Sequence, residues 1–296
     1  MTHLGIDVGG TNTKAALVDD ELAVLATFEV PTHADGTLDT VIRAIESVAT
    51  GVGTRAATIG IALPGIVDDT SGRAIFVPNL GWFEGVDIAD AVERRLGIRP
   101  VLANDAVCAA VGEARFGAGV GLGSFLMLTL GTAVGAAVIR DGMPLDAYGR
   151  YGGELGHIPL VHDGLPCSCG IRGCFQQYGS ATALLRMAHD EGLDVEKASD
   201  VFSLAAAGDV TAGEVADAFC AYVAEGAAGL TNIFRPEAVI LAGGAARAGE
   251  ALRASVEEKL FARTYASEVL GAPRVLLAQE PAHAGSLGAA VIAGRL

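Results

Sequence analysis

The sequence is poor in basic residues, and this shortage limits the partners that the protein can bind. Its 296 residues include 20 Lys and Arg against 35 Asp and Glu, which gives a formal net charge of -15 at pH 7. Binding to a nucleic-acid backbone requires clustered Lys and Arg side chains that neutralise the phosphates. The composition therefore argues against nucleic acid as a partner.

Long apolar runs are also missing. No apolar stretch reaches roughly 18 residues without a charge or a turn signal, so we expect no membrane span. The first residues, MTHLGIDVGG, contain no basic region followed by an apolar signal stretch. The cysteines resemble free or metal-bound thiols, which suit a reducing compartment, and we expect a cytoplasmic protein.

Glycine, in contrast, is abundant. The chain contains 40 glycines, many of them in short clusters such as Gly9-Gly10 and Gly243-Gly244. This distribution indicates tight backbone turns rather than a flexible low-complexity segment. With 51% hydrophobic residues, a chain of this length can bury a large core and is expected to form two lobes.

The apolar periodicity of the first part of the chain predicts an α/β protein. Strands are predicted at residues 4–8, 14–18, 22–30, 57–63 and 100–103, and helices at 37–48, 87–96 and 106–116.

His3 and His33 are expected at the surface, and Cys108 and Cys220 in buried helical surroundings.

The middle of the chain repeats the opening pattern of strand, glycine turn and strand, at 125–130, Gly131-Thr132 and 135–139. The chain is then largely helical to about residue 234, and a strand at 238–241 and a helix at 285–293 follow. The duplication predicts two related lobes that face each other across a cleft. We place the first lobe at 1–117 plus 285–296 and the second at 118–284.

One short segment carries four candidate metal ligands, His157, Cys167, Cys169 and Cys174. A C-x-C pair followed by a third cysteine in a glycine-containing loop can wrap one zinc ion tetrahedrally. Three unrelated cysteines are the alternative, which this clustering disfavours. Glu154 lies three residues before His157, so we predict a structural zinc site beside a polar ligand site.

Glycine turns after apolar strands supply candidate anion sites. Asp7 is followed by Gly9, Gly10 and Thr11, so backbone N–H groups can approach a phosphate while the Asp7 carboxylate holds Mg²⁺ through water. A plain hairpin turn is the alternative. Two further glycine turns strengthen the prediction of a nucleotide triphosphate site, and they consist of Gly131, Thr132, Gly243 and Gly244.

Asp105 is the candidate general base. A sugar hydroxyl is a poor nucleophile, and a carboxylate within hydrogen-bonding distance can accept its proton during phosphoryl transfer. Asn104 offers an amide that can grip a vicinal diol. The alternative is that the Asn104-Asp105 pair only caps a helix.

These motifs together resemble the ROK family of sugar kinases and repressors, and the resemblance covers essentially the whole chain. The matching strings are DVGGTNTK (7–14), ALPG (62–65), PNLGW (78–82), LANDA (102–106), LGTAVG (130–135), GGELGH (152–157) and CSCGIRGC (167–174). The resemblance implies the two-lobed actin-like ATPase fold, hexokinase-type and ribonuclease H-like, with ATP and sugar in the interlobe cleft.

The resemblance also implies residue roles. Asp105 would be the catalytic base, and Mg²⁺ would accompany ATP. The sugar would be held by Gly65, Asn79, Asn104, Asp105, Glu154 and His157, and the phosphates by the 7–14 segment, which includes Asn12 and Lys14. Structural zinc would be held by His157, Cys167, Cys169 and Cys174.

Two positions depart from the family pattern. Gln176 stands where the family usually has a Glu that contacts the sugar, so the substituent that it meets can differ from that of glucose. Ala133 stands within the usual GTGxG phosphate loop, where its Cβ could weaken the grip on the nucleotide.

The predicted activity is ATP- and Mg²⁺-dependent phosphorylation of a hexose at its 6-hydroxyl, with glucose as the expected substrate. The alternatives are a kinase for an amino or N-acyl hexose (ManNAc, GlcNAc or kanosamine type) or for fructose, and a sugar-sensing repressor. The first strand begins at residue 4 without a basic recognition helix before it, which disfavours the repressor. Polyphosphate as donor is disfavoured by the lack of a Lys/Arg track. We expect a homodimer or homotetramer.

Overall fold

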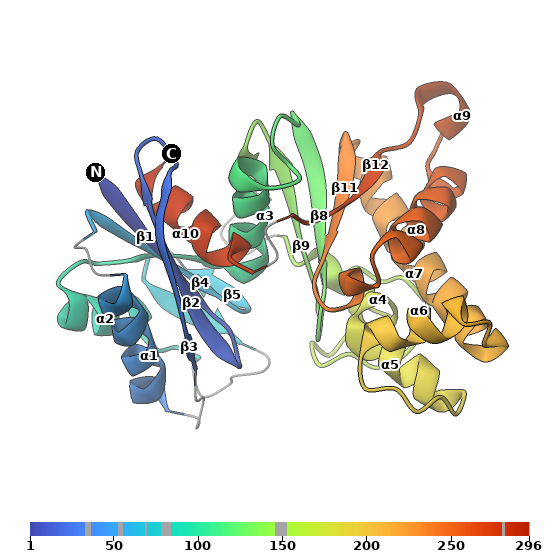
Figure 1. The fold of residues 1–296 in the computed structure, drawn as a ribbon, viewed down its shortest axis with the longest axis horizontal. Coiled ribbons are helices and arrows are strands. Elements are labelled where there is room, and N and C mark those ends of the chain that lie inside the picture. The colour runs from blue at the N-terminus through green and yellow to red at the C-terminus, as the bar shows by residue number, and fades with distance from the viewer. Residues whose placement is uncertain are drawn as a thin grey trace. The chain divides into compact units, whose positions relative to one another are not determined.

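The computed structural model describes residues 1–32, 37–52, 56–68, 70–77, 84–145, 153–279 and 282–295. The chain divides into two compact units (Figure 1). The first contains Met1–Gly121, Gly142–Gly152 and Gln279–Leu296, and the second contains Leu122–Asp141 and Gly153–Ala278. The predicted division into a sugar lobe and a nucleotide lobe stays a prediction.

The first unit is built on a five-stranded sheet in the order β3-β2-β1-β4-β7. β1 (Thr2–Val8) and β2 (Asn12–Asp19) form an antiparallel hairpin, and β3 (Val24–Pro31) pairs antiparallel with β2. β4 (Thr58–Leu63) runs parallel to β1, and β7 (Val101–Asn104) runs parallel to β4. The carboxyl ends of β1, β4 and β7 therefore lie at the same edge of the sheet.

Helices cover both faces of this sheet. α1 (Leu38–Gly51) and α2 (Ile88–Leu96) bury their apolar side chains against one face. α10 (Ala284–Gly294) packs on the other face and against α3 (Asp105–Phe116). The approach of α10 is close, because a Cβ at Gly5 of β1 would lie 1.7 Å from a carbonyl oxygen of α10. Glycine is therefore required there.

Two shorter elements complete the first unit. β5 (Ile66–Asp68) and β6 (Arg73–Phe76) form an antiparallel hairpin, which the sequence pattern did not predict. The other element is a two-residue strand, β10 (Met143–Pro144).

The prediction that His3 lies at the surface is wrong. His3 is only 3% exposed on β1, and both of its ring nitrogens have partners. Nδ1 lies 2.9 Å from Thr58 Oγ1, and Nε2 lies 3.0 Å from Asp20 Oδ1. These hydrogen bonds let the imidazole be buried. The predictions that Cys108 and Cys220 are buried are confirmed, and position 33 lies outside the described residues.

The second unit repeats the connectivity of the first. β8 (Ser124–Leu130) and β9 (Val134–Arg140) form an antiparallel hairpin, β11 (Ala238–Ala242) runs parallel to β8, and β12 (Arg274–Leu277) runs parallel to β11. The order β9-β8-β11-β12 therefore matches β2-β1-β4-β7 of the first unit. The predicted internal duplication is confirmed.

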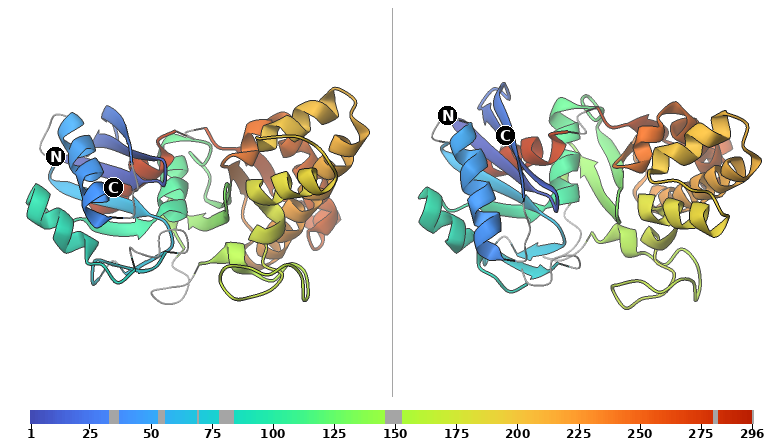
Figure 2. Two further views of the ribbon diagram at one scale, coloured as in Figure 1. Left: turned by 90° about the horizontal axis from the view of Figure 1, so that it is seen from below. Right: turned by 60° about the horizontal axis from the view of Figure 1, so that its bottom comes forward.

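The remaining elements of the second unit are helical, and the longer helices gather on one face of its sheet (Figures 1 and 2). Along the described residues, no helix is both long enough and apolar enough to span a membrane. The helical elements are η2 (Leu155–His157), α4 (Gln176–Gly179), α5 (Ala181–Asp190), α6 (Ala198–Ala206), α7 (Val210–Phe234), η3 (Ala245–Ala248), α8 (Glu250–Arg263) and α9 (Ser267–Leu270).

Candidate active site and metal site

The turn between β1 and β2 carries the predicted phosphate site of the first unit. The Gly9 N–H donates to the Asn12 carbonyl oxygen at 3.0 Å, and the Thr32 hydroxyl donates to the Gly9 carbonyl oxygen at 2.7 Å. Gly10 and Thr11, at the tip, are exposed, and a Cβ at Gly10 would meet nothing within 4 Å. The turn is therefore rigid at its base and open at its tip, where an anion can approach the backbone.

Asp7 and Lys14 face each other across this hairpin. The Asp7 carboxylate lies against the first turn of α10, because a Cβ at Gly285 would be 2.5 Å from Asp7 Oδ2. Burial raises the pKa of Asp7 to about 6, and the positive charge of Lys14 opposes this shift. The Lys14 ammonium donates to the Ala282 carbonyl oxygen at 2.9 Å. Asp7 is thus a half-buried carboxylate that titrates close to neutral pH.

Gly65, Asn104 and Asp105 lie together at the carboxyl ends of β4 and β7. Asn104 Nδ2 donates to the Gly65 carbonyl oxygen at 3.0 Å, and Asn104 Oδ1 accepts from the N–H groups of Ala106 and Val107. Asn104 is therefore the residue that caps α3. Asp105 is the first residue of α3, where the helix dipole favours an ionised carboxylate.

The buried thiol of Cys108 connects the two carboxylates. Burial raises the pKa of Cys108 well above its usual range, and the charges of Asp7 and Asp105 raise it further. The strand register places both carboxylates at one edge of the sheet, because Asp7 of β1 is opposite Ala62 of β4, which is opposite Ala103 of β7. The fold of the first unit thus brings together two carboxylates that are 98 positions apart in the sequence (105 minus 7).

The two glycine turns of the second unit also lie together. A Cβ at Gly243 would be 2.7 to 2.8 Å from backbone atoms of Leu130, next to Gly131. Its φ of 86° is a left-handed value that favours glycine. Gly244 lies near Ala181, since its Cβ would be 3.7 Å from the Ala181 side chain. Gly131, Gly243 and Gly244 therefore place a second set of backbone N–H and carbonyl groups close together in this unit.

A helix start that the sequence pattern did not predict lies beside these two glycine turns. The Ala181 N–H, at the start of α5, donates to the Gly131 carbonyl oxygen at 2.8 Å. Ser180 caps the helix, and its hydroxyl accepts from the Ala183 N–H at 3.0 Å. The signal was present in the sequence, because Ser before a run of helix-forming residues is typical of an N-cap.

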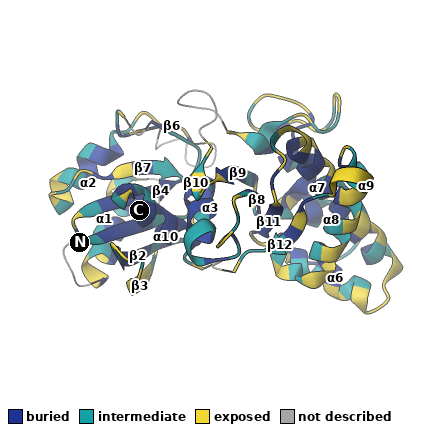
Figure 3. Cartoon of the chain, turned by 90° about the horizontal axis from the view of Figure 1, so that it is seen from above, coloured by how far each residue is buried: buried dark blue, intermediate teal, exposed yellow. Residues whose placement is uncertain are grey.

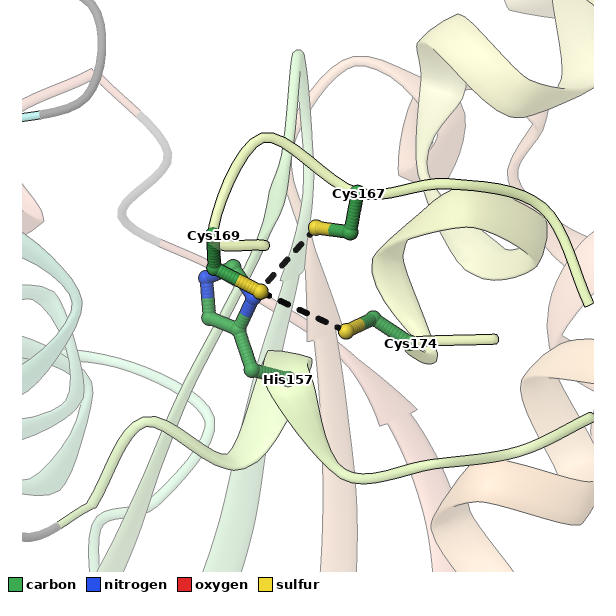
Figure 4. A group of neighbouring side chains, drawn as sticks. All are labelled: His157, Cys167, Cys169 and Cys174. Atoms are coloured by element: carbon green, nitrogen blue, oxygen red, sulfur yellow. Dashed lines mark hydrogen bonds between the residues drawn. The ribbon is translucent and has the colours of Figure 1, made fainter. Parts of the chain in front are cut away.

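The four predicted zinc ligands converge, as Figure 4 shows. His157 comes from η2, and the three cysteines come from the loop between η2 and α4. One ligand atom from each residue lies within 4.8 Å of every other. We call these residues, His157, Cys167, Cys169 and Cys174, the Cys₃His cluster.

The distances within the Cys₃His cluster fit a tetrahedral zinc ion. Bonds of about 2.3 Å to sulfur and about 2.0 Å to nitrogen place two sulfurs about 3.8 Å apart, and a sulfur about 3.5 Å from a nitrogen. The Cys169 and Cys174 sulfurs are 3.6 Å apart, and the Cys167 sulfur is 3.6 Å from His157 Nδ1. The cluster can therefore hold structural zinc through His157 Nδ1, which leaves Nε2 for another partner.

The thiols of the Cys₃His cluster influence one another. Burial disfavours the Cys167 thiolate, but hydrogen bonds from Cys169 and from two glutamine side chains outweigh burial and lower the pKa of Cys167 to about 6. Burial and the neighbouring sulfurs raise the pKa of Cys174 to about 12. A divalent cation would relieve this mutual repulsion, because it stabilises every thiolate that binds it.

Backbone hydrogen bonds hold the loop of the Cys₃His cluster in shape. The Leu160 N–H donates to the Gly173 carbonyl oxygen at 2.7 Å, and the Cys167 N–H donates to the Ile171 carbonyl oxygen at 2.9 Å. Gly173 has a φ of 78°, and a Cβ there would lie 1.8 Å from the Val161 carbonyl oxygen. Glycine is therefore required at this turn.

The other predicted sugar contacts are Glu154, Gln176 and Asn79. Glu154 is exposed and directly precedes η2, so it lies on the segment that carries His157. Gln176 is buried, and its Nε2 donates to Cys167 Sγ at 3.0 Å. Asn79 lies outside the described residues.

Comparison with known proteins places this architecture. The family model described as "ROK family" matches residues 3–295. A glucokinase from Thermotoga maritima is 34% identical over 313 aligned positions, which cover 98% of this chain and 96% of that protein.

Two solved structures match over the full length of this chain. One is a ROK family glucokinase from Streptomyces griseus in complex with glucose and AMPPNP, with a TM-score of 0.86 and 31% identity over 100% of both chains. The other is a ROK hexokinase from Thermus thermophilus, with a TM-score of 0.86 and 32% identity over 100% of this chain and 98% of that chain. The fold is thus the two-lobed actin-like fold of the sugar kinases, and the chain belongs to the ROK family.

Proposed function

We propose that this protein transfers the γ-phosphoryl group of ATP to the 6-hydroxyl of a hexose, and that the hexose is glucose. The observation that carries the proposal is the pair of carboxylates, Asp7 and Asp105, at the carboxyl edge of the first sheet, next to an open glycine turn. Such a pair supplies one group near the phosphates and one near the hydroxyl. The similarity to a glucokinase over nearly the whole chain supports glucose as the substrate.

In this proposal Asp105 accepts the proton of the attacking hydroxyl. Asn104 caps α3 and thereby fixes the position of its neighbour. Asp105 lies at the start of α3, where the helix dipole favours negative charge, and its carboxylate is the proposed base. Gly65, Asn79 and Asn104 are the proposed sugar contacts of the first unit.

Asp7 would hold Mg²⁺ through water, and the bound ion would neutralise charge on the phosphates. The β1–β2 turn would direct backbone N–H groups and the Lys14 side chain toward the phosphates. The other proposed nucleotide contacts are Gly9, Gly10, Thr11, Asn12, Gly131, Thr132, Gly243 and Gly244.

The second unit would contribute Glu154, His157 and Gln176 to sugar binding. Structural zinc in the Cys₃His cluster would fix the His157 ring, so that Nε2 can bond a sugar hydroxyl. Because Gln176 Nε2 already donates to Cys167, the Gln176 oxygen is the atom that we assign to the sugar. It would accept from a hydroxyl as a carboxylate does, which fits plain glucose.

The proposal includes an assembly and a location. A homodimer or homotetramer is supported by the exposure of α9 (Figure 3) and by the apolar residues in and next to it, since Tyr265 is 76% exposed and Val269 is 83% exposed. We also propose that the protein acts in the cytoplasm, because its thiols are free. Light scattering after gel filtration tests the assembly, and a monomer would contradict it.

A coupled assay of ADP release over a panel of sugars tests the proposed activity. The panel contains glucose, fructose, mannose, aminohexoses and N-acetylhexosamines, and polyphosphate replaces ATP in a parallel series. We expect the highest kcat/KM with glucose and ATP. Turnover of an amino or N-acyl hexose above glucose would overturn the substrate. No turnover with any sugar would instead indicate a sugar sensor.

A further inference from the structure

Gln176 is a buried amide whose place in the fold connects it to the Cys₃His cluster. It is the first residue of α4, two positions after Cys174, and it is only 9% exposed. Its Nε2 donates to the sulfur of Cys167 at 3.0 Å, inside the usual range for a hydrogen bond to sulfur. A buried amide donor directed at a candidate metal ligand requires an explanation beyond packing.

The local backbone fixes both partners of this hydrogen bond. On the sulfur side, the Gly170 N–H donates to the Cys167 carbonyl oxygen at 3.0 Å and closes the turn that carries Cys169. On the amide side, Phe175 is fully buried, and its N–H donates to the Ile158 carbonyl oxygen at 2.9 Å. Backbone hydrogen bonds therefore fix the two segments that carry the Gln176 amide and the Cys167 sulfur.

The chemistry of the pair favours a metal-bound thiolate. A thiolate accepts hydrogen bonds, and an amide N–H that donates to it spreads part of the negative charge away from the sulfur. Hydrogen-bonding partners of this kind tune metal affinity, and their loss typically weakens it by about 10- to 100-fold.

We propose that Gln176 is a positioning residue for the metal: its amide donates to the Cys167 thiolate and so retains the ion in the Cys₃His cluster. This inference does not depend on the proposed phosphotransferase activity. Gln176→Met removes the donor at similar length, and Gln176→Leu removes it with a shorter apolar side chain.

The first test measures the rate at which zinc passes from the folded, zinc-loaded protein to a chromogenic chelator, without sugar or nucleotide. We expect zinc transfer from Gln176→Met and Gln176→Leu to be about 10- to 100-fold faster than from the wild type. Gln279→Met is the matched control, because Gln279 is exposed and belongs to the other compact unit. Its transfer rate should equal that of the wild type.

The second test uses cobalt in place of zinc and records the sulfur-to-cobalt charge-transfer band. Loss of the hydrogen bond raises the energy of the sulfur lone pair, so the band should move to longer wavelength in Gln176→Met. Should Gln176→Met not fold, Gln176→Leu decides in its place. Folded variants with transfer rates within twofold of the wild type and an unshifted band would overturn the proposal, whatever their kinase activity.

Discussion

The Asp7 carboxylate lies half-buried against the first turn of α10, where its ionised form is disfavoured. Burial raises the pKa of Asp7 from 3.8 to about 6, against the opposing charge of Lys14. A carboxyl group whose pKa is higher in the folded protein than in the unfolded chain contributes stability at a pH below its unfolded pKa. That contribution is lost as the pH rises through about 6. At neutral pH the ionised Asp7 therefore lowers the stability of the protein.

Asp7→Asn should accordingly stabilise the protein while it lowers activity. We expect the free energy of unfolding at pH 7.5 to rise by about 1–2 kcal/mol, which is less than the full shift implies because the group is partly solvated. At pH 4.5 the difference should shrink, since Asp7 of the wild type is then protonated. Urea unfolding at both pH values measures this, and equal differences at the two pH values would contradict the assignment.

Single residues also show where the sequence was and was not sufficient. The cluster of Cys and His was predictable, because four ligands within one loop can converge without long-range information. The burial of His3 was not predictable, because its partners Thr58 and Asp20 come from distant parts of the chain. The orientation of Gln176 toward Cys167 was equally hidden, since side-chain direction depends on the folded loop.

The loop that carries the Cys₃His cluster is largely exposed, so apolar packing contributes little to its order. Cys169 is only partly buried, and the segment around it contains turns rather than regular secondary structure. A loop of this kind gains much of its order from metal binding, because the ligands are not preformed in the unfolded chain.

Cys169→Ser should therefore lower the zinc content from about one ion per chain to well below one-half, since structural zinc needs four donors. Melting temperature and sugar affinity should fall together, because His157 is the proposed link between metal and sugar. Elemental analysis, differential scanning calorimetry and calorimetric glucose titration give the three readouts. Cys220→Ser, on the buried face of α7 and outside the cluster, is the control for loss of a thiol. A fully active, metal-free wild-type protein would exclude the zinc assignment.

Among the elements, the helices of the first unit were predicted, and some of the short strands were missed. The pattern of apolar residues predicted α1 and α2 because their buried side chains recur at helical spacing. The hairpin of β5 and β6 and the strand β12 have only three or four residues each, which is too short for a periodic signal. Their pairing is decided by neighbouring strands.

At the scale of the whole molecule, α3 stabilises the points where the chain leaves the first unit. Glu113 is a fully buried carboxylate on α3, and its Oε2 accepts the N–H groups of Ala118 at 2.7 Å and Gln279 at 3.1 Å. The chain leaves the first unit after Gly121, returns to it for Gly142–Gly152, and returns again at Gln279. The Glu113 carboxylate therefore holds the segment at Ala118 next to the segment at Gln279.

Glu113→Ala should lower the free energy of unfolding by about 1–3 kcal/mol, because two partly buried hydrogen bonds to a buried carboxylate are lost. Glu113→Gln keeps an acceptor oxygen and should lose clearly less. Urea unfolding of both variants provides the comparison. If Glu113→Ala lowered the free energy of unfolding no more than Glu113→Gln does, the Glu113 carboxylate would not be the acceptor that holds these segments.

The duplicated connectivity was predictable from the sequence because both copies begin with a strand, a Gly-Thr or Gly-Gly-Thr turn and a second strand. The matching order of the following parallel strands was not predictable, because parallel pairing joins residues far apart in the chain. The same limit applies to the pair of Asp7 and Asp105. Each carboxylate stood out in its own motif, but only the sheet brings them to one edge.

The most direct test of the account is the turnover of Asp105→Asn with glucose and ATP. The amide keeps the size of the side chain and removes the proton acceptor, so kcat should fall by roughly 10² to 10⁴. Glucose affinity, measured by calorimetry in the same variant, should stay within a few-fold of the wild type. A variant with near wild-type kcat would contradict the account, because Asp105 would then have no role as the base in phosphoryl transfer.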